Sequence, residues 1–257
     1  GLLQPAEPDC SRRKGLWTAN LGHRVATTAL NPFAPDIWVA EGPVVSFFGF
    51  PYPTRMVVIR LRPGSLFVWS PVALTPELKA EVEAVGTVAH LVSPNKIHHL
   101  FLKAWKDAYP HARIHALDEL KKRKLALPIE ALLDDAPNPE WAADIDQVVV
   151  RGSFALSEVV FFHRKSRTAI FADLIQNFSP DWFKGWKGFV ARLGGIVSTH
   201  PGTPVDWRTS FWNRKRARAA LDRILAWQPE QVVIAHGIPV RNDGVDFIRH
   251  ALGWLLK

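Results

Sequence analysis

Residues 75–99 read TPELKAEVEAVGTVAHLVSPNKIHH, and this stretch decides the fold class. Its first three residues are typical of a helix start, because threonine caps the first turn, proline fits the first helical position and an acid there complements the helix dipole. Gly86 predicts the end of that helix. Residues 90–92 then read as a buried strand that runs into a polar segment, 93–99. The stretch therefore predicts a helix, a strand and a cluster of polar side chains at the strand's end.

The segments on either side of this stretch alternate between strands and helices. Upstream, four strands are expected, and Pro63 with Gly64 marks a turn between the last two. These strands span residues 37–40, 44–48, 55–61 and 65–69. Downstream, a helix at about 97–108 precedes a strand at 112–117. The β-α-β-α-β succession predicts an α/β fold in which helices sandwich a sheet.

The second half of the chain contains further strands and two longer helices. A proline- and alanine-rich stretch, 127–143, is expected to be a surface connection. Strands are expected at 146–151, 158–163, 168–172 and 231–235, with a long helix at about 209–227 and a last helix from about 245. We find no internal repeat and no linker between two cores. The expectation is therefore a single domain over residues 1–257, with residues 1–35 as an irregular lead-in.

The composition is that of a folded protein. Of the 257 residues, 47% are hydrophobic and 22% are charged, which excludes a disordered chain. No apolar run approaches the roughly 18 residues that a membrane-spanning helix needs. The only cysteine, Cys10, excludes an internal disulfide and a cysteine zinc cage. We expect a cytoplasmic protein, although a disulfide-free exported protein fits the same count, and the start at Gly1 leaves a removed targeting segment open.

The formal net charge of +8 is concentrated in two short runs, 121–124 and 214–216. Such a charge attracts phosphates, nucleic acid or an anionic membrane surface. Neither run is interleaved with a known nucleic-acid-binding signature, so we do not expect nucleic acid as a partner. The simpler interpretation is a solvated basic surface, and an unknown small molecule is the expected partner.

Side chains of the metal-ligand type follow three of the expected strands. His98 and His99 follow the first of these strands, Asp173 follows a second and His236 a third. In α/β sheets, ligands gather at the carboxyl ends of strands, because buried strands deliver such residues to one edge with little freedom. The pattern predicts that these four side chains converge on one site.

The order of these features resembles the metallo-β-lactamase superfamily. Chains of that family begin with strand hairpins, followed by a helix and a strand that ends in a cluster of histidines. Later in the chain come an aspartate that follows a hairpin and a histidine at the end of a late strand. Asp173 and His236 stand at these last two positions. The resemblance runs from about Val44 to His236 and looks closest to a branch known as a domain of unknown function, with a similar Ser-Pro-Asn-x-x-His-His stretch. It implies a four-layer αββα sandwich.

The family motif, His-x-His-x-Asp-His, is only half preserved. With its last histidine placed on His99, the two histidines of the first metal site fall on Pro94 and Lys96, and the aspartate falls on His98. A further first-site histidine would fall near Phe154. Proline has no donor atom and a protonated lysine repels a cation. The resemblance therefore implies that the first site is lost and that Lys96 keeps a second ion out.

The second metal site of the family remains. His98, His99, Asp173 and His236 are expected to hold one Zn²⁺ or Fe²⁺ ion. A pair of adjacent histidines by itself more often lies on a helix surface than in a metal site. The combination of this pair with Asp173 and His236 favours a metal site. The alternative is a relic site, in which the histidines bond to Asp173 without a metal.

Four further residues lie near these positions in the sequence. Glu158, at a strand start, is a candidate substitute ligand. Ser70 occupies a strand end where family members often carry an aspartate. His163 is expected in an exposed turn, and His200, in a loop, is a candidate substrate contact.

Two classes of function remain open. The first is a hydrolase with one metal ion, whose bound water attacks an ester, thioester or phosphoester; Asp173 would be a ligand and the catalytic residue that orients the water. Four tryptophans would then cover an apolar substrate, or simply pack helices: Trp182, Trp186, Trp207 and Trp212. The second is a non-catalytic descendant of the fold that binds a ligand or partner. A nuclease ranks last, because two-metal phosphodiester chemistry needs both sites.

Overall fold

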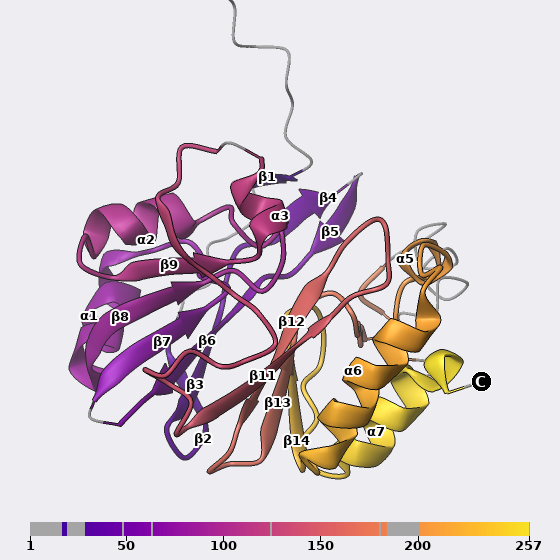
Figure 1. Ribbon diagram of the computed structural model, residues 1–257. Coiled ribbons are helices and arrows are strands. Elements are labelled where there is room, and N and C mark those ends of the chain that lie inside the picture. Colours follow the sequence, from indigo (N-terminus) through magenta and orange to yellow (C-terminus); the bar gives the residue numbers. More distant parts are fainter. Residues whose placement is uncertain are drawn as a thin grey trace, which may run out of the picture.

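The computed structural model describes residues 17–19, 29–47, 49–62, 64–123, 125–179, 181–183 and 201–256. Two sheets lie face to face in the middle of the molecule, and helices cover the outer face of each (Figure 1). A smaller sheet of three strands lies beside them. This arrangement is the four-layer αββα sandwich that the sequence predicts.

The first sheet has seven strands, in the order β10-β9-β8-β7-β6-β3-β2. They are β2 (Asn31–Ala34), β3 (Ile37–Glu41), β6 (Arg55–Arg60), β7 (Ser65–Trp69), β8 (Thr87–Val92), β9 (Arg113–Ala116) and β10 (Ile129–Leu132). From β2 to β7 neighbouring strands pair antiparallel, and from β7 to β10 they pair parallel. The parallel half brings the carboxyl ends of β7, β8 and β9 to one edge of the sheet.

The second sheet has four strands, in the order β11-β12-β13-β14. They are β11 (Ile145–Val150), β12 (Glu158–His163), β13 (Thr168–Phe171) and β14 (Gln231–Ile234). The last two strands pair parallel, with Phe171 opposite Ile234, so their carboxyl ends lie side by side. The small antiparallel sheet consists of β1 (Trp17–Ala19), β4 (Val45–Phe47) and β5 (Phe50–Tyr52).

Helices cover both outer faces. On the seven-stranded sheet lie α1 (Pro76–Val85), α2 (Leu102–Ala108) and α3 (Asp118–Lys121). On the four-stranded sheet lie α5 (Val205–Thr209), α6 (Arg214–Ala226), α7 (Gly244–Ala251) and the 3-10 helix η1 (Gly253–Leu255). Among the described residues, no helix has the length and apolar character that crossing a membrane requires.

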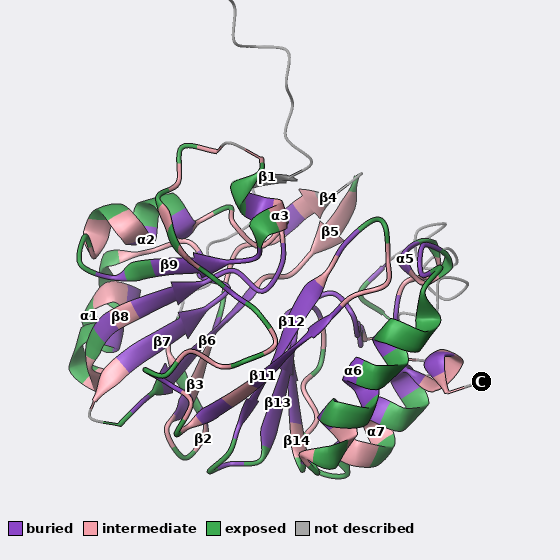
Figure 2. Ribbon diagram, in the orientation of Figure 1, coloured by how far each residue is buried: buried purple, intermediate pink, exposed green. Residues whose placement is uncertain are grey.

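The inner core lies between the two sheets, where the strands are buried almost throughout (Figure 2). Phe67 packs edge-on against Trp141 and Phe161, with ring centroids 5.1 Å and 5.3 Å away. Burying a large apolar side chain stabilises a fold by about 1.5–3 kcal/mol. The contact between the sheets therefore fixes how their strand ends meet.

The helix α1 has the boundaries that its sequence predicts. The Thr75 hydroxyl oxygen accepts a hydrogen bond from the Leu78 N–H at 3.2 Å, and the helix starts at Pro76. Its last turn is closed by the Gly86 N–H, which donates to the Val82 carbonyl. The chain then enters β8 directly, which places the polar segment after this strand at the sheet edge.

Three strands lie where the sequence analysis expects irregular chain. β1 and β2 fall within residues 1–35, and β10 falls within 127–143. β2 and β10 are the two edges of the seven-stranded sheet, and both have exposed positions along their length. Edge strands carry proline and charged residues more freely than central ones, so they lack the apolar pattern that identifies a strand.

Two expected helices differ from the structure. Residues 97–101 form turns, so α2 starts only at Leu102. The expected long helix is interrupted between α5 and α6, where the Asn213 side chain accepts a hydrogen bond from the Arg216 N–H at 3.2 Å. Asparagine at this position starts a new helix, because it satisfies an N–H that has no partner within the helix.

Candidate metal centre

Three of the predicted ligand residues meet where the two sheets converge. His98 lies in the turn after β8, Asp173 follows β13, and His236 follows β14. The first residue comes from the seven-stranded sheet and the other two from the four-stranded sheet. The site is therefore built across the contact between the sheets.

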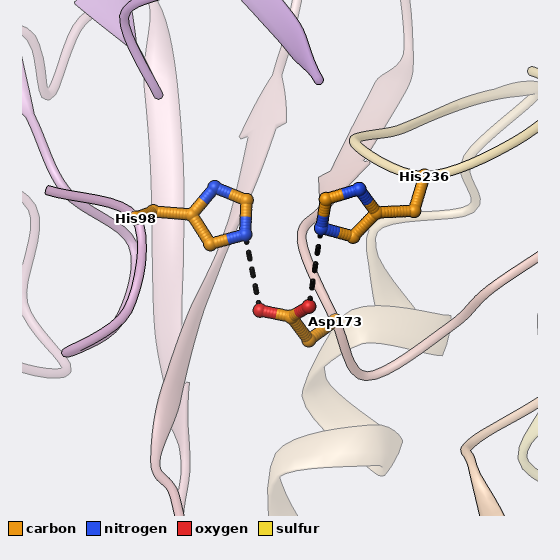
Figure 3. A group of neighbouring side chains, drawn as sticks. All are labelled: His98, Asp173 and His236. Carbon is orange, nitrogen blue, oxygen red and sulfur yellow. Dashed lines mark ion pairs between the residues drawn. The ribbon is translucent and has the colours of Figure 1, made fainter. Parts of the chain in front are cut away.

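The two imidazoles face the same carboxylate (Figure 3). His98 Nε2 lies 3.0 Å from Asp173 Oδ2, and His236 Nε2 lies 3.2 Å from Asp173 Oδ1. One ligand atom from each residue falls within 4.8 Å of the others. Metal–ligand bonds of about 2 Å allow two ligands of one ion to be roughly 3–4 Å apart, so only a small adjustment brings all three onto one ion.

Each imidazole is held at its other nitrogen. His98 Nδ1 lies 2.7 Å from the Ser70 hydroxyl, and His236 Nδ1 lies 2.7 Å from the Pro53 carbonyl oxygen. Histidines that bind metals almost always have such a partner on the second nitrogen, which fixes the tautomer and the ring orientation. The Tyr52 ring packs edge-on against His236, with centroids 5.2 Å apart, and further restricts that ring.

The bond to Pro53 decides where the proton of His236 lies. A carbonyl oxygen only accepts, so Nδ1 of His236 carries the hydrogen. In the neutral imidazole, Nε2 then presents a lone pair to an oxygen of Asp173, 3.2 Å away. Two lone pairs at this distance repel one another. A cation or a proton between them removes the repulsion, so the donor set fits a bound metal ion.

The carboxylate of Asp173 is buried but remains ionised. Burial acts to raise its pKa, but the two imidazoles beside it, His98 first, outweigh burial, and the pKa lies far below its ordinary value. The Asn95 Nδ2 group donates to Asp173 Oδ2 at 2.7 Å. An ionised, oriented carboxylate is the form that binds a cation.

Asn95 is a site residue that the sequence analysis did not single out. It is fully buried, and its Oδ1 accepts hydrogen bonds from the N–H groups of Ile97 and His98 at 3.0 and 3.2 Å. These bonds form the turn that directs His98 toward Asp173. The available signal was an asparagine just after a strand, since asparagine side chains commonly bond to the backbone two residues on.

Glu158 supports the site and does not face it. Its carboxylate accepts hydrogen bonds from three consecutive N–H groups, those of Ala172, Asp173 and Leu174, at 2.8, 2.7 and 3.0 Å. Burial and the neighbouring charge of Asp173 raise its pKa above the ordinary value. Both oxygens are occupied by the backbone, so the structure assigns this residue to holding the Asp173 loop and not to the ligand set.

Arg55 holds the loop of His236. This buried residue of β6 donates to the carbonyl oxygens of Ile234 and Gly237, which flank the histidine, the second at 2.7 Å. Its guanidinium also pairs with Glu41 at 2.6 Å. A buried arginine is unusual unless paired, but sequence alone offers no indication that its partners lie about 180 residues away.

Residues 36–184, more than half of the chain, match the family described as Domain of unknown function (DUF4336). The chain belongs to this family. The match contains His98 and Asp173 and ends before His236. A comparison with curated proteins finds no match.

Solved structures similar to the DUF4336 chain share its fold. DIM-1 metallo-β-lactamase exposed to ceftazidime is 15% identical, with a TM-score of 0.60 over 91% of this chain and 99% of that one. A metallo-β-lactamase from Pontibacter korlensis is 8% identical, with a TM-score of 0.59 over 90% and 99%. The metal-soaked Flv1 flavodiiron core from Synechocystis sp. PCC6803 is 12% identical, with a TM-score of 0.57 over 89% and 61%. At these identities, the likeness shows the metallo-β-lactamase fold alone.

The structure leaves His99 outside the three-residue group of the DUF4336 chain. Of the two adjacent histidines in the turn after β8, only His98 reaches Asp173. Burial, followed by the charge of Arg123, lowers the pKa of His99 to about 4. His99 is therefore a half-buried neutral imidazole beside the centre, and the candidate ligand set in the described residues has three members.

This difference moves the correspondence with the family motif by one residue. With His98 as the last histidine of the motif, the earlier positions fall on Ser93, Asn95 and Ile97 instead of Pro94, Lys96 and His98. Serine, asparagine and isoleucine do not replace two histidines and an aspartate. The first metal site of the superfamily therefore has no ligand set here in either register.

A cavity of about 250 Å³ adjoins the centre. Its lining is Tyr52, Lys96, Ile97, Ala155, Leu156, Asp173, Gln176, Pro204, Asp206 and Trp207. The Lys96 ammonium donates to the Ala155 carbonyl and lies 3.7 Å from Glu119, so it forms part of the cavity wall. A space of this size has room for several waters or one small molecule.

The four tryptophans have different surroundings. Trp207 is 7% exposed and lines the cavity, as expected of a tryptophan that covers an apolar substrate. The Trp182 indole donates to the Pro51 carbonyl at 3.0 Å. Trp212 is 85% exposed, and Trp186 lies outside the described residues. The described tryptophans therefore do not form one common cover.

The expectation of an exposed His163 is wrong. This residue is 1% exposed, and its Nδ1 lies 2.8 Å from the Ser166 hydroxyl. It is covered because β12 is flanked on both sides by paired strands, with Ile145 and Thr168 as its direct neighbours. His200 lies outside the described residues.

Proposed function

We propose that this protein is a hydrolase with one metal ion, Zn²⁺ or Fe²⁺, that acts on a small ester or thioester. The observation that carries the proposal is the tautomer of His236, whose Nε2 lone pair faces Asp173 across 3.2 Å. His98 adds a second imidazole to the same carboxylate. Two imidazole nitrogens and a carboxylate oxygen suit either ion.

Three protein ligands favour a catalytic site over a structural one, because structural zinc sites are closed by four protein ligands. When bound, a divalent ion would supply a water of lowered pKa and a positive charge that polarises the substrate. The Pro53 carbonyl keeps the His236 lone pair directed inward, and the Ser70 hydroxyl holds the His98 ring in its orientation. Asp173 stays ionised and is the residue that would orient the water. Trp207 and Leu156 give the adjoining cavity an apolar wall for the substrate.

The second candidate is a ligand-binding descendant of the fold without catalysis. The residues in place of the first metal site, Ser93, Asn95 and Ile97, support it, because many hydrolases of this fold use two ions. In that case the two histidines and Asp173 form a hydrogen-bonded group, with His236 as an imidazolium. Metal content separates the two candidates.

The test is a zinc titration by calorimetry, together with metal analysis of protein purified without chelator. The wild type is expected to bind one ion per chain, since Ser93, Asn95 and Ile97 stand at the positions of the first site and do not supply its ligands. His98→Gln should weaken zinc binding by orders of magnitude. His99→Gln is the matched control, because it removes the adjacent imidazole, which lies outside the ligand set.

Each outcome has a distinct meaning. Two ions per chain would refute the one-ion site, and negligible heat for all three proteins would refute metal binding and leave the ligand-binding candidate. If zinc binds, hydrolysis of a p-nitrophenyl ester and an acetyl thioester is measured with and without the ion. Zinc binding without hydrolysis of either substrate would contradict the proposed activity.

A further inference from the structure

One surface of the molecule combines exposed aromatic side chains with unpaired cations. Phe154 is 75% exposed and Trp212 is 85% exposed. Arg214, Lys215 and Arg216 follow at the start of α6 and are also exposed. We propose that this aromatic–cationic patch, these five residues, binds the surface of an anionic phospholipid bilayer.

The two aromatic residues lie on one pair of hydrogen-bonded segments although they are distant in sequence. Segments 152–154 and 210–213 run antiparallel and bond to each other through the backbone. The Phe154 N–H donates to the Ser210 carbonyl at 3.3 Å. Trp212 lies one residue beyond the centre of this pairing, so both rings project from the same small backbone element.

The cations of the patch have no carboxylate partners. Within the part of the chain that the structure describes, no ion pair involves Arg214, Lys215 or Arg216. The first turn of α6 contains no acidic residue, although acids are favoured there by the helix dipole. Asn213 already accepts the Arg216 N–H. Helix stability therefore does not explain these charges. Arg214 lies over the Trp254 ring, 5.9 Å from its centroid, and Lys215 and Arg216 remain available to an external anion.

The patch faces away from the core. α6 buries Ala217, Ala220, Leu221 and Ile224 against the four-stranded sheet, and its other face is solvent-exposed (Figure 2). Leaving two large aromatic side chains this exposed is unfavourable in water, and such patches commonly mark interaction sites. Neither ring is needed for packing the sandwich.

An anionic bilayer matches both halves of the patch. Tryptophan and phenylalanine enter the boundary between headgroups and acyl chains, and nearby lysine and arginine are attracted to anionic lipids. Single-stranded nucleic acid would also attract cations and stack on aromatic rings, but it needs a cationic groove that follows the strand. The lining of the cavity beside the patch includes two carboxylates, Asp173 and Asp206, so the cavity does not extend the patch into such a cationic groove.

The patch also borders the cavity. Ala155, Leu156 and Trp207 line the cavity wall. Phe154 immediately precedes the first two in the chain, and Trp212 lies five residues after Trp207. Binding at a bilayer would therefore bring the cavity close to the lipid surface. The lipid interaction itself does not depend on a bound metal.

The test is co-sedimentation with vesicles of phosphatidylcholine alone and of phosphatidylcholine and phosphatidylglycerol in equal parts. Wild-type protein is expected to bind the mixed vesicles, more weakly as salt rises, and not the neutral ones. Lys215→Gln with Arg216→Gln should reduce binding by about 30-fold, since each cation contributes about five-fold near an anionic surface. Lys121→Gln with Lys122→Gln, in the other exposed basic run, is the matched control and should reduce binding far less.

The aromatic half of the patch has its own variant. Trp212→Ser with Phe154→Ser should abolish binding at physiological salt while the circular dichroism spectrum stays that of the wild type. His236→Ala should bind vesicles normally, which separates this proposal from that of the metal centre. Equal binding of both vesicle types, normal binding by the aromatic variant, or binding of a single-stranded RNA oligonucleotide instead of vesicles would overturn the proposal.

Discussion

His98 and His236 are each held at the nitrogen that faces away from Asp173, by a hydroxyl in one case and a carbonyl in the other. These outer bonds cost little to form, because both histidines are buried where water does not compete. The carbonyl decides which lone pair of His236 is offered to an ion, and the hydroxyl orients the ring of His98.

Ser70→Ala is expected to weaken zinc binding by about 10–100-fold, because an outer partner keeps the imidazole in the right tautomer and orientation. Ser166→Ala is the control. It removes a hydroxyl that lies 2.8 Å from His163 Nδ1. His163 is at the end of β12 opposite Glu158, so the substitution should leave zinc affinity unchanged. Isothermal titration measures both, and equal affinities for Ser70→Ala and wild type would contradict the assigned role.

A second pair of histidines makes stability depend on pH. His90 Nδ1 lies 3.1 Å from His115 Nε2, and burial lowers the pKa of the first to about 4 and of the second to about 3. Unfolded histidine titrates near 6.5, so the unfolded chain takes up protons first as pH falls. Stability is therefore complete above about 6.5 and decreases from there down to the folded pKa values, by up to about 1.4 kcal/mol per pH unit for each group.

Urea unfolding at pH 7 and at pH 5 measures this dependence. His115→Gln removes one of the two groups and should roughly halve their share of the loss of stability between these pH values. His111→Gln removes an exposed histidine of the neighbouring turn and serves as the control. A loss in His115→Gln as large as that of the wild type would show that the pair does not titrate as described.

At the scale of elements, the site depends on loops that are held from other strands. Glu158, at the start of β12, holds the loop after β13, and Arg55, in β6, holds the loop after β14. Each is a buried ionisable side chain whose polar atoms bond to backbone groups. Hydrogen bonds to charged groups contribute about 1.5–3 kcal/mol, more than neutral ones.

Arg55→Met is expected to destabilise the protein by about 2–4 kcal/mol, because it leaves the carbonyl oxygens of Ile234 and Gly237 buried without their donor. Arg60→Met, in the same strand, removes an exposed arginine that pairs with Asp36 at 2.7 Å and should cost at most about 1 kcal/mol. Chemical unfolding compares the two variants. Similar costs for both would exclude a special role for Arg55.

At the scale of the whole molecule, the candidate ligands join the two sheets. His98 follows a strand of the seven-stranded sheet, and Asp173 and His236 follow strands of the four-stranded sheet. A bound ion would therefore oppose the separation of the sheets. It would also bind the folded chain alone, because the unfolded chain does not bring residues 98, 173 and 236 together.

Zinc is expected to stabilise the wild type against unfolding by about 2.7 kcal/mol when the free ion is at a hundred times its dissociation constant. Excess chelator should remove this increment without unfolding the protein, since apolar burial holds the sheets. His236→Ala should show no increment at the same zinc concentration. Thermal unfolding with zinc or with chelator tests this, and an equal increment in the variant would place the ion elsewhere.

The sequence by itself determined the layers of the fold. Helix signals such as Thr75 with Pro76, and apolar runs such as β6 and β12, depend on residues close together in the chain. The same local logic placed His98, Asp173 and His236 at strand ends. The edge strands β2 and β10 were not predicted, because half of each strand is exposed to solvent and its sequence lacks an apolar pattern.

Only the tertiary structure decided which polar groups meet. Local sequence does not distinguish His98 from His99, because the choice depends on the turn that Asn95 forms and on Asp173, 75 residues further on. Glu158 is a candidate ligand from its sequence position, but in the structure its oxygens accept hydrogen bonds from three backbone N–H groups of another loop. Which residues are buried can be seen in the sequence, because apolar residues recur at the short spacing of a strand or helix. Which group pairs with a buried charge depends instead on distant chain segments, and these meet only when the two sheets pack together.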